Sequence, residues 1–186
     1  RNHNTNIRYI AFLINTEKYP AAQSALNSLR ESGGEKPDLL FLQGRLDLLN
    51  TDFESAKVNL TQSFQLRPSA GTAILLSRAN LLQGDFAAAI DALDPWLADH
   101  SNDITVLMEK AGIFLSQNEE EMAIDVYKDI IELDPESVPA LNNLAWLSRE
   151  RDQEYAMEMI TRARQLQPND PAILDTLGYL LLERGD

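Results

Sequence analysis

The sequence predicts an all-α fold, an α-solenoid in which pairs of short helices repeat along the chain. The first observation is an alanine of the second helix that returns every 33 or 34 residues, at Ala22, Ala56, Ala89, Ala123 and Ala156. The second is a small residue of the first helix that returns in step with it, at Ala11, Gly44, Ser77, Ala111, Ala145 and Gly178. A small side chain at a fixed place lets two helix backbones approach closely, so both series predict repeated helix packing.

The stretch from Ser137 to Asp170 shows the repeat most clearly, and Pro168 closes it. Apolar residues at helical spacing mark one face of each helix, with Leu141, Leu144, Ala145 and Leu147 in the first and Ala156, Ile160, Ala163 and Leu166 in the second. The pattern of Leu141, Leu144, Ala145, Ala156, Ala163 and Pro168 resembles the tetratricopeptide repeat (TPR), whose helix pairs recur with a period of about 34 residues.

The resemblance covers nearly the whole chain and implies a TPR-type right-handed superhelix of about five helix–turn–helix repeats and one terminal helix. We expect a single array over residues 1–186, with repeats at about 4–36, 37–69, 70–103, 104–137 and 138–170 and a final half-repeat at 171–186. The chain begins with Arg1 and ends at Gly185-Asp186, which reads as the turn before a second helix. We therefore expect the array to be a fragment of a longer protein.

Helix pairs are predicted in order along the chain. Their ranges are 4–15 and 19–31, 37–50 and 52–66, 70–83 and 86–98, 103–116 and 120–133, two helices within 137–170, and a last helix at 171–183. Gly33-Gly34 suits the positive φ that ends a helix, and a hinge between subdomains is the alternative interpretation. Asp52 and Asp85 precede second helices, where each carboxylate can accept hydrogen bonds from free backbone N–H groups.

Pro95 is the clearest irregularity, because it falls inside a predicted second helix. Proline removes the backbone hydrogen bond to the carbonyl of Asp91, so the helix should kink or stop there. The motif Asp94-Pro95-Trp96 is then either a tolerated late kink or part of a partner surface.

The last predicted helix has the pattern of a first helix without its second helix. It carries Leu174, Leu177, Gly178 and Leu181 in the places of the earlier repeats. We expect its apolar face to be exposed unless the rest of a longer protein covers it, and such a face can mediate self-association.

Composition and charge exclude several functions. The formal net charge is −13, which opposes nonspecific binding of nucleic acid and of anionic membranes. The charge indicates a merely soluble acidic surface, and a basic partner is the alternative. The chain has no cysteine, so disulfides, thiolate metal sites and cysteine nucleophiles are excluded. No apolar run approaches the roughly 18 residues of a membrane span, so we predict no direct membrane insertion by these residues.

Catalytic and metal-binding patterns are not visible, so we predict a protein that is not an enzyme and uses no cofactor. Histidine occurs only at His3 and His100, and we expect both side chains to be solvated. Three acidic residues at 119–121 are compatible with a cation site, but their place at a helix N-terminus is explained by the helix macrodipole.

The first helices of TPR arrays line a concave groove, so the resemblance implies that a partner binds there. Positions three before, one after and four after each small residue share one stripe of a first helix. The predicted partner-binding residues are Arg8, Phe12, Phe41, Arg45, Arg78, Met108, Asn142, Trp146, Arg149 and Tyr179. Arginines and aromatic rings among apolar residues suit an extended or helical peptide. The alternative is that apolar stripe residues such as Ile74, Leu81 and Leu115 pack only between neighbouring helices.

Two known TPR binding modes can be compared with this stripe. Chaperone-type TPR domains hold a C-terminal carboxylate with a repeated set of lysines, arginines and asparagines, which this sequence lacks. The sugar-transferase TPR array carries asparagines two residues before the small residue, and here only Asn143 matches. The sequence supports neither mode.

Residues 140–152 and 163–186 carry a narrower resemblance. They look like the C-terminal repeats of bacterial TPR lipoproteins of the PEP-CTERM/exosortase and exopolysaccharide systems. That family implies an exported, membrane-tethered scaffold in the periplasm or outside the cytoplasmic membrane; because the same phrase occurs in unrelated bacterial TPR proteins, a cytoplasmic location is the alternative. We predict a non-catalytic scaffold that binds a protein or peptide in the groove, in bacterial export or exopolysaccharide assembly. The alternatives are a structural or oligomerisation module and the regulatory part of a larger enzyme.

Overall fold

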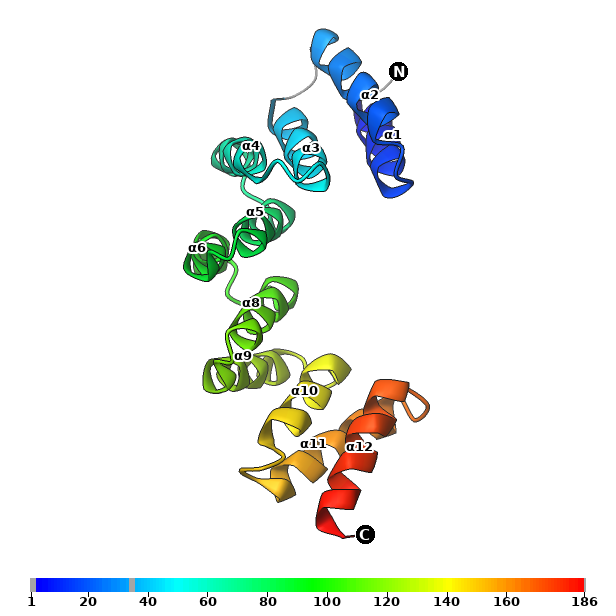
Figure 1. Cartoon of the computed structure of the whole chain (residues 1–186), viewed down its shortest axis with the longest axis vertical. Coiled ribbons are helices and arrows are strands. Elements are labelled where there is room, and N and C mark those ends of the chain that lie inside the picture. The colour runs from blue at the N-terminus through cyan, green and yellow to red at the C-terminus, as the bar shows by residue number, and fades with distance from the viewer. Residues whose placement is uncertain (1–2, 34–35, 186) are drawn as a thin grey trace. The chain divides into compact units, whose positions relative to one another are not determined.

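The computed structural model describes residues 3–33 and 36–185, which form helices joined by short turns (Figure 1). The helices are α1 (His3–Asn15), α2 (Tyr19–Glu31), α3 (Lys36–Leu49), α4 (Phe53–Leu66), α5 (Ala70–Leu82), α6 (Phe86–Asp91), α7 (Asp94–Asp99), α8 (Ile104–Ser116), α9 (Glu120–Leu133), α10 (Val138–Ser148), α11 (Gln153–Leu166) and α12 (Pro171–Arg184). Within these two ranges there is no β-strand, and the predicted all-α fold is confirmed. Gly34 and the side chain of His3, which entered the predictions above, lie outside the description.

The chain divides into two compact units, Arg1–Ser101 with α1 to α7 and Asn102–Asp186 with α8 to α12. Each unit is described by itself. In the first, α1 packs on α2, α3 on α4 and α5 on α6; in the second, α8 packs on α9 and α10 on α11. The expected single array over residues 1–186 and its repeat boundaries stay a prediction.

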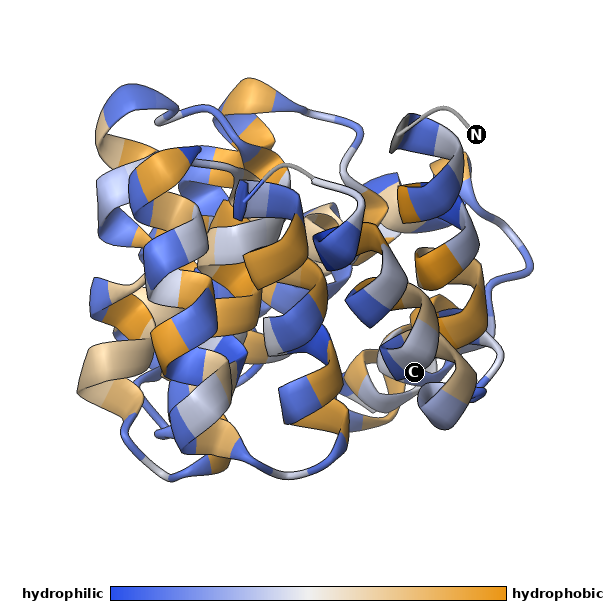
Figure 2. Ribbon diagram, turned by 90° about the horizontal axis from the view of Figure 1, so that it is seen from above, coloured by the Kyte–Doolittle hydropathy of each residue, from blue (hydrophilic) through white to orange (hydrophobic). Residues whose placement is uncertain are grey.

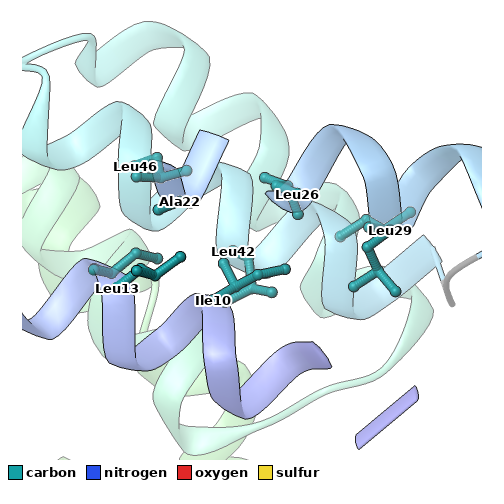
Figure 3. Packing of buried hydrophobic residues seen from close by; sticks show 9 residues of the cluster. Ile10, Leu13, Ala22, Leu26, Leu29, Leu42 and Leu46 are labelled. Carbon is teal, nitrogen blue, oxygen red and sulfur yellow. The ribbon is translucent and has the colours of Figure 1, made fainter. Parts of the chain in front are cut away.

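The core lies between successive helices, as the periodic apolar residues predict. Figure 3 shows Ile10 and Leu13 of α1 meeting Leu26 of α2 and Leu42 of α3, and these side chains are buried. Figure 2 shows hydrophobic and hydrophilic residues interspersed along the helices. Each helix pair thus depends on the next helix to complete its core.

Close backbone approach at the small residues is confirmed most clearly at Gly44. A Cβ atom at Gly44 would lie 2.6 Å from Cγ of Leu60, so α3 and α4 touch at a place where only hydrogen fits. The equivalent residues Ser77, Ala111 and Ala145 are fully buried. The alanines of the second helices, from Ala22 to Ala156, are also fully buried.

The predicted helix ends are present. The carboxylate of Asp52 accepts a hydrogen bond from the N–H of Ser55 at 3.1 Å, and that of Asp85 accepts one from the N–H of Ala88 at 3.0 Å. Gly33, with φ of 79°, has the positive φ expected after α2. Thr51 has φ of 60° in the turn between α3 and α4, which is a strained conformation for a β-branched residue.

Pro95 divides the second helix of the third repeat, as predicted. Helix α6 ends at Asp91, and α7 begins at Asp94 with Pro95 in its first turn. The ring of Trp96 then stacks on that of His100, with centroids 3.6 Å apart. The structure therefore contains a helix break at the proline and an aromatic stack directly after it.

Candidate partner-binding site

The predicted partner-binding residues lie on first helices and fall into two sets, one in each unit. The first set is Arg8 and Phe12 on α1, Phe41 and Arg45 on α3, and Arg78 on α5. The second is Met108 on α8, Asn142 and Trp146 on α10, Arg149 directly after α10, and Tyr179 on α12. Arg8, Phe12 and Arg78 are exposed, while Phe41, Arg45 and Met108 are half-buried.

In the first unit, the structure joins α1 and α3 through Arg45. Its Nη2 donates a hydrogen bond to Oδ1 of Asn15 at 3.0 Å, and its guanidinium carbon lies 6.0 Å from the centre of the Phe41 ring. Partial burial lowers the pKa of the Arg45 guanidinium, because removal from water disfavours the charged form. Arginine nevertheless keeps its charge at neutral pH, so this face presents a held cation beside an aromatic ring.

In the second unit, Trp146, Arg149 and Tyr179 come together, and we call them the α10–α12 cluster. The rings of Trp146 and Tyr179 lie 5.1 Å apart with a tilt of 58°, which is a favourable aromatic geometry. The guanidinium of Arg149 lies 4.3 Å from the centre of the Trp146 ring, within the range of a cation–π interaction. Trp146 is 41% exposed and Tyr179 is 38% exposed. The cluster therefore presents two large rings at the surface, with a largely buried cation beside them.

The polar atoms of the α10–α12 cluster are held by local hydrogen bonds. Nη1 of Arg149 donates to the carbonyl of Trp146 at 2.7 Å, and Nη2 pairs with Oε1 of Glu150 at 3.1 Å. The hydroxyl of Tyr179 donates to Oε1 of Glu183 at 3.2 Å. Nε of Arg149 is buried without a hydrogen-bond partner. These bonds hold the guanidinium of Arg149 and the ring of Tyr179, while the rings of Trp146 and Tyr179 stay partly exposed.

Asn142 lies in a separate pocket of the second unit. This pocket has a volume of 260 Å³ and lies between α10, the end of α11 and the start of α12, with Gln167 and Asp170 among its polar residues. Oδ1 of Asn142 is buried and accepts no hydrogen bond. A buried unpaired acceptor costs about 1–3 kcal/mol, which the N–H group of a bound segment would relieve.

Sequence reasoning missed a buried polar network around Asp47, which joins α3 to its neighbours. Asp47 is 8% exposed and accepts hydrogen bonds from Nε2 of Gln43 at 2.9 Å and from Nδ2 of Asn59 on α4 at 2.7 Å. Gln43 and Gln23 on α2 exchange two further bonds at 3.1 and 3.2 Å. An available signal was Asp47 itself, since its counterparts in the first and fourth repeats are the apolar Ile14 and Phe114.

Two of the acidic residues at 119–121 pair with a cation of the chain. Arg151, in the turn before α11, forms ion pairs with Glu121 and, at 3.6 Å, with Glu120. In the described ranges no group of three or more histidine, cysteine or acidic side chains is placed to hold a metal ion. None of the described helices has the length and apolarity needed to cross a lipid bilayer.

Comparison with known proteins gives two related sequences among curated proteins, and no family model matches the chain. A TPR repeat-containing protein of Pseudomonas aeruginosa is 26% identical over 152 residues, which cover 80% of this chain and 25% of that protein. Anaphase-promoting complex subunit 7 of Dictyostelium discoideum is 33% identical over 95 residues, which cover 50% of this chain and 16% of that protein. The chain thus spans a quarter or less of the length of these relatives.

Solved structures decide the fold. A TPR protein of Parabacteroides merdae superposes with a TM-score of 0.73 at 19% identity, covering 82% of this chain and 61% of that one. A TPR protein of Thermus thermophilus superposes with a TM-score of 0.67 at 16% identity, and the match covers 97% of this chain and 100% of that one. The TPR protein YrrB superposes with a TM-score of 0.66 at 15% identity, and the match covers 93% of this chain and 90% of that one. The chain has the TPR fold.

Both candidate faces lie on first helices of the TPR fold. TPR arrays use the extended surface formed by successive repeats for binding, and TPR proteins generally act as protein-interaction scaffolds on a fold that is generally non-catalytic. The narrower resemblance to PEP-CTERM lipoproteins stays a prediction from residues 140–152 and 163–186.

Proposed function

We propose that this protein is a non-catalytic scaffold that binds a protein or peptide segment through its first-helix faces. The observation that carries the proposal is the α10–α12 cluster, where Trp146 and Tyr179 from successive first helices expose large rings side by side. Tryptophan, tyrosine and arginine, which this cluster combines, are the residues that most often dominate binding energy at protein interfaces. A partner side chain that packs on the two rings would remove their apolar surface from water.

Electrostatics favour a partner that carries positive charge. The chain has a formal net charge of −13, so a basic segment is attracted over a long range and approaches faster at low salt. Glu150 and Glu183 lie beside the cluster and offer local carboxylates to such a segment. The peptide form of the proposal also has a precedent in YrrB, a protein of similar fold described as having an unusual peptide-binding site.

The face of the first unit supports the same function with a different arrangement. Phe12 is exposed on α1, and Phe41 lies beside the held cation of Arg45 on α3. A segment bound there would meet aromatic surface and a guanidinium whose position is already fixed by Asn15. Fixing the guanidinium beforehand lowers the entropy cost of binding.

The test is affinity capture from a bacterial lysate with the chain and with two single variants of the second unit. Trp146→Ser removes the exposed ring, while Met122→Ser removes an equally exposed apolar side chain on the second helix α9. We expect a partner that the chain and Met122→Ser retain and that Trp146→Ser loses, with the same helical circular dichroism in all three. A partner that Trp146→Ser retains would overturn the role of the cluster. In the first unit, Arg45→Glu with Arg78→Glu should weaken a partner that uses that face.

The setting in bacterial export or exopolysaccharide assembly is part of the proposal and rests on the narrower resemblance alone. The identity of a captured partner tests it directly. A structural or oligomerisation module is the second candidate, favoured by the apolar residues that α12 exposes, Leu174 and Leu182. A regulatory part of a larger enzyme is the third, and the full length of the parent protein decides it.

A further inference from the structure

The two units contain pockets at equivalent places, where the second helix of one repeat ends and the first helix of the next begins. In the first unit a pocket of about 210 Å³ lies between α3, the end of α4 and the start of α5. In the second unit the pocket of 260 Å³ described above lies between α10, the end of α11 and the start of α12. We call them the first junction pocket, lined by Asp38, Arg67 and Ser69 among others, and the second junction pocket, lined by Asn142, Gln167 and Asp170 among others.

The first junction pocket contains a cation of the chain itself. Arg67, directly after α4, forms an ion pair with Asp38 of α3, and its Nη2 donates to Oδ1 of that carboxylate. The side chain of Asp38 is only 20% exposed, so the pair is partly shielded from water. The pocket exists although α6 packs on α5, so a second helix packed on the next first helix does not close a pocket of this kind.

The second junction pocket has the opposite charge balance. Counted from the small residues of the repeat, Gln167 takes the place of Arg67, and Asp170 takes the place of Ser69. Among the described residues that line this pocket there is no lysine or arginine, and Asp170 contributes one formal negative charge. The second junction pocket therefore lacks the cation that the first one contains and has a carboxylate in place of a hydroxyl group.

Side chains from two helices supply oxygen acceptors to the second junction pocket. Oδ1 of Asn142 on α10 is buried without a hydrogen-bond partner. Oδ1 of Asp170 accepts the N–H groups of Ala172 and Ile173 at the start of α12, at 2.9 and 3.3 Å. A carboxylate offers about four lone-pair sites, so Asp170 can accept further donors. A guanidinium presents several N–H donors in a planar fork and suits two separate acceptors, whereas an ammonium is a compact point charge.

The helix terminus at this pocket does not prevent cation binding. The N-terminus of α12 carries partial positive charge, which opposes a cation, and the carboxylate of Asp170 offsets it. In the first unit Arg67 lies at the same place beside the N-terminus of α5, so the fold accepts a guanidinium there.

We propose that the second junction pocket binds the guanidinium of an arginine side chain carried by the bound segment. The guanidinium donates to Oδ1 of Asn142 and pairs with Asp170, as Arg67 pairs with Asp38 in the first unit. This inference rests on the proposed function for the segment that carries the arginine. Asn142 and Trp146 lie one helical turn apart on α10, so a segment packed on the α10–α12 cluster can bring an arginine to the pocket.

The test uses Nα-acetyl-L-arginine amide as a probe, titrated into the ¹⁵N-labelled chain. We expect saturable shifts of the side-chain amide resonances of Asn142 and of the backbone amide resonances of Asp170 and Ala172. Nα-acetyl-L-lysine amide should bind about tenfold more weakly, because it carries the same charge without the planar fork of donors.

Variants of the pocket test each acceptor. Asp170→Asn keeps a residue that caps a helix and removes the charge, and Asn142→Leu removes the buried acceptor, so each should weaken probe binding about tenfold. Asp103→Asn is the matched control and should bind the probe unchanged, because Oδ1 of Asp103 caps α8 with the same two bonds, from the N–H groups two and three residues later. Gln167→Arg places an arginine where the first unit has Arg67 and should abolish the shifts. All four variants should keep the helical circular dichroism of the parent chain.

Three results of the titrations would overturn the proposal. The first is the absence of shifts at Asn142 and Asp170. The second is equal binding of the arginine and lysine probes, because a point charge would then suffice. The third is an equal loss of binding in Asp170→Asn and Asp103→Asn, because the net charge of the chain would then attract the probe.

One further variant separates this proposal from the proposed function. Trp146→Ser removes a ring of the α10–α12 cluster and should leave binding of the arginine probe unchanged. In the capture experiment Asp170→Asn should lose the partner that Trp146→Ser loses. A partner that Trp146→Ser loses and Asp170→Asn retains would leave the scaffold function standing and overturn the arginine of the bound segment.

Discussion

Helices α3 and α12 share the pattern of a first helix, including a glycine at the point of closest approach, yet one is covered and the other is open. On α3, Leu60 of α4 sits against Gly44 and Asn59 bonds to Asp47. On α12, Gly178 meets nothing and Leu181 is half-buried. The comparison teaches that the sequence pattern defines a face, while the neighbouring helix decides whether that face is core or surface.

The first prediction concerns the same substitution, glycine to leucine, at Gly44 and at Gly178. Gly44→Leu would force a side chain between α3 and α4 and should destabilise the first unit by about 3 kcal/mol, because overpacking a close contact displaces both helices. Gly178→Leu adds a side chain in open space and replaces glycine within a helix, so it should stabilise α12 by about 0.5–1 kcal/mol. Urea unfolding followed by circular dichroism measures both changes.

Effects of the same sign at both glycines would contradict the comparison. Gly112→Leu provides the control, because it reports the gain from removing a helical glycine without any neighbouring contact. If the control and Gly178→Leu agree while Gly44→Leu differs, the cost at Gly44 comes from its close contacts with Leu60 and the carbonyl of Ala56 on α4.

The second prediction replaces Asp47 of α3 with leucine, the residue that α12 has at the equivalent position 181. Asp47→Leu removes the acceptor of Asn59 and one of the two acceptors of Gln43. It should cost about 2 kcal/mol, since the amide of Asn59 loses its partner in a part-buried site while Gln43 keeps its bond to Gln23. Adding Asn59→Leu to Asp47→Leu should recover part of this loss, because the unpaired amide of Asn59 is then removed. No recovery in the double variant would show that Asp47 acts through packing and not through hydrogen bonds.

Local signals account for the parts of the fold that could be predicted from sequence. Helix ends at Asp52 and Asp85, the positive φ at Gly33 and the break at Pro95 each depend on a few neighbouring residues, and each is present. The period of the small residues predicted the close approach at Gly44. The open face of α12 also followed from the period, because the pattern placed a first helix there without a second.

Tertiary placement accounts for what could not be predicted. The period assigned Trp146, Arg149 and Tyr179 to one stripe, but the stacking distances and the bond of Arg149 to the Trp146 carbonyl depend on rotamers that no periodicity specifies. The network of Asp47 requires Gln23 and Asn59 from two other helices, so it appears only when the helices are packed. Whether the stripe binds a partner stays a prediction.

The third prediction extends the comparison to α9, where a tyrosine takes the place that Leu60 has on α4. Tyr127 is buried, and burial raises the pKa of its hydroxyl above the ordinary value, while a hydrogen bond with Asn143 acts in the opposite direction. Tyr127→Phe keeps the ring and should cost about 1 kcal/mol at neutral pH through loss of that bond. Tyr127→Phe should also change how the free energy of unfolding depends on pH in the alkaline range, because the phenylalanine side chain has no group that ionises.

The sign of the alkaline effect follows from the direction of the pKa shift. A folded-state pKa above the unfolded value means that the folded chain holds the tyrosine proton more tightly. The resulting stability is fully present below the unfolded pKa of about 10 and is lost as pH rises through the folded pKa. Between about pH 9 and pH 11 the parent chain should therefore lose more unfolding free energy than Tyr127→Phe. Tyr9→Phe, at an exposed tyrosine, serves as the control. If the parent and Tyr127→Phe lose the same free energy over this range, the hydroxyl of Tyr127 is not the group that burial protects.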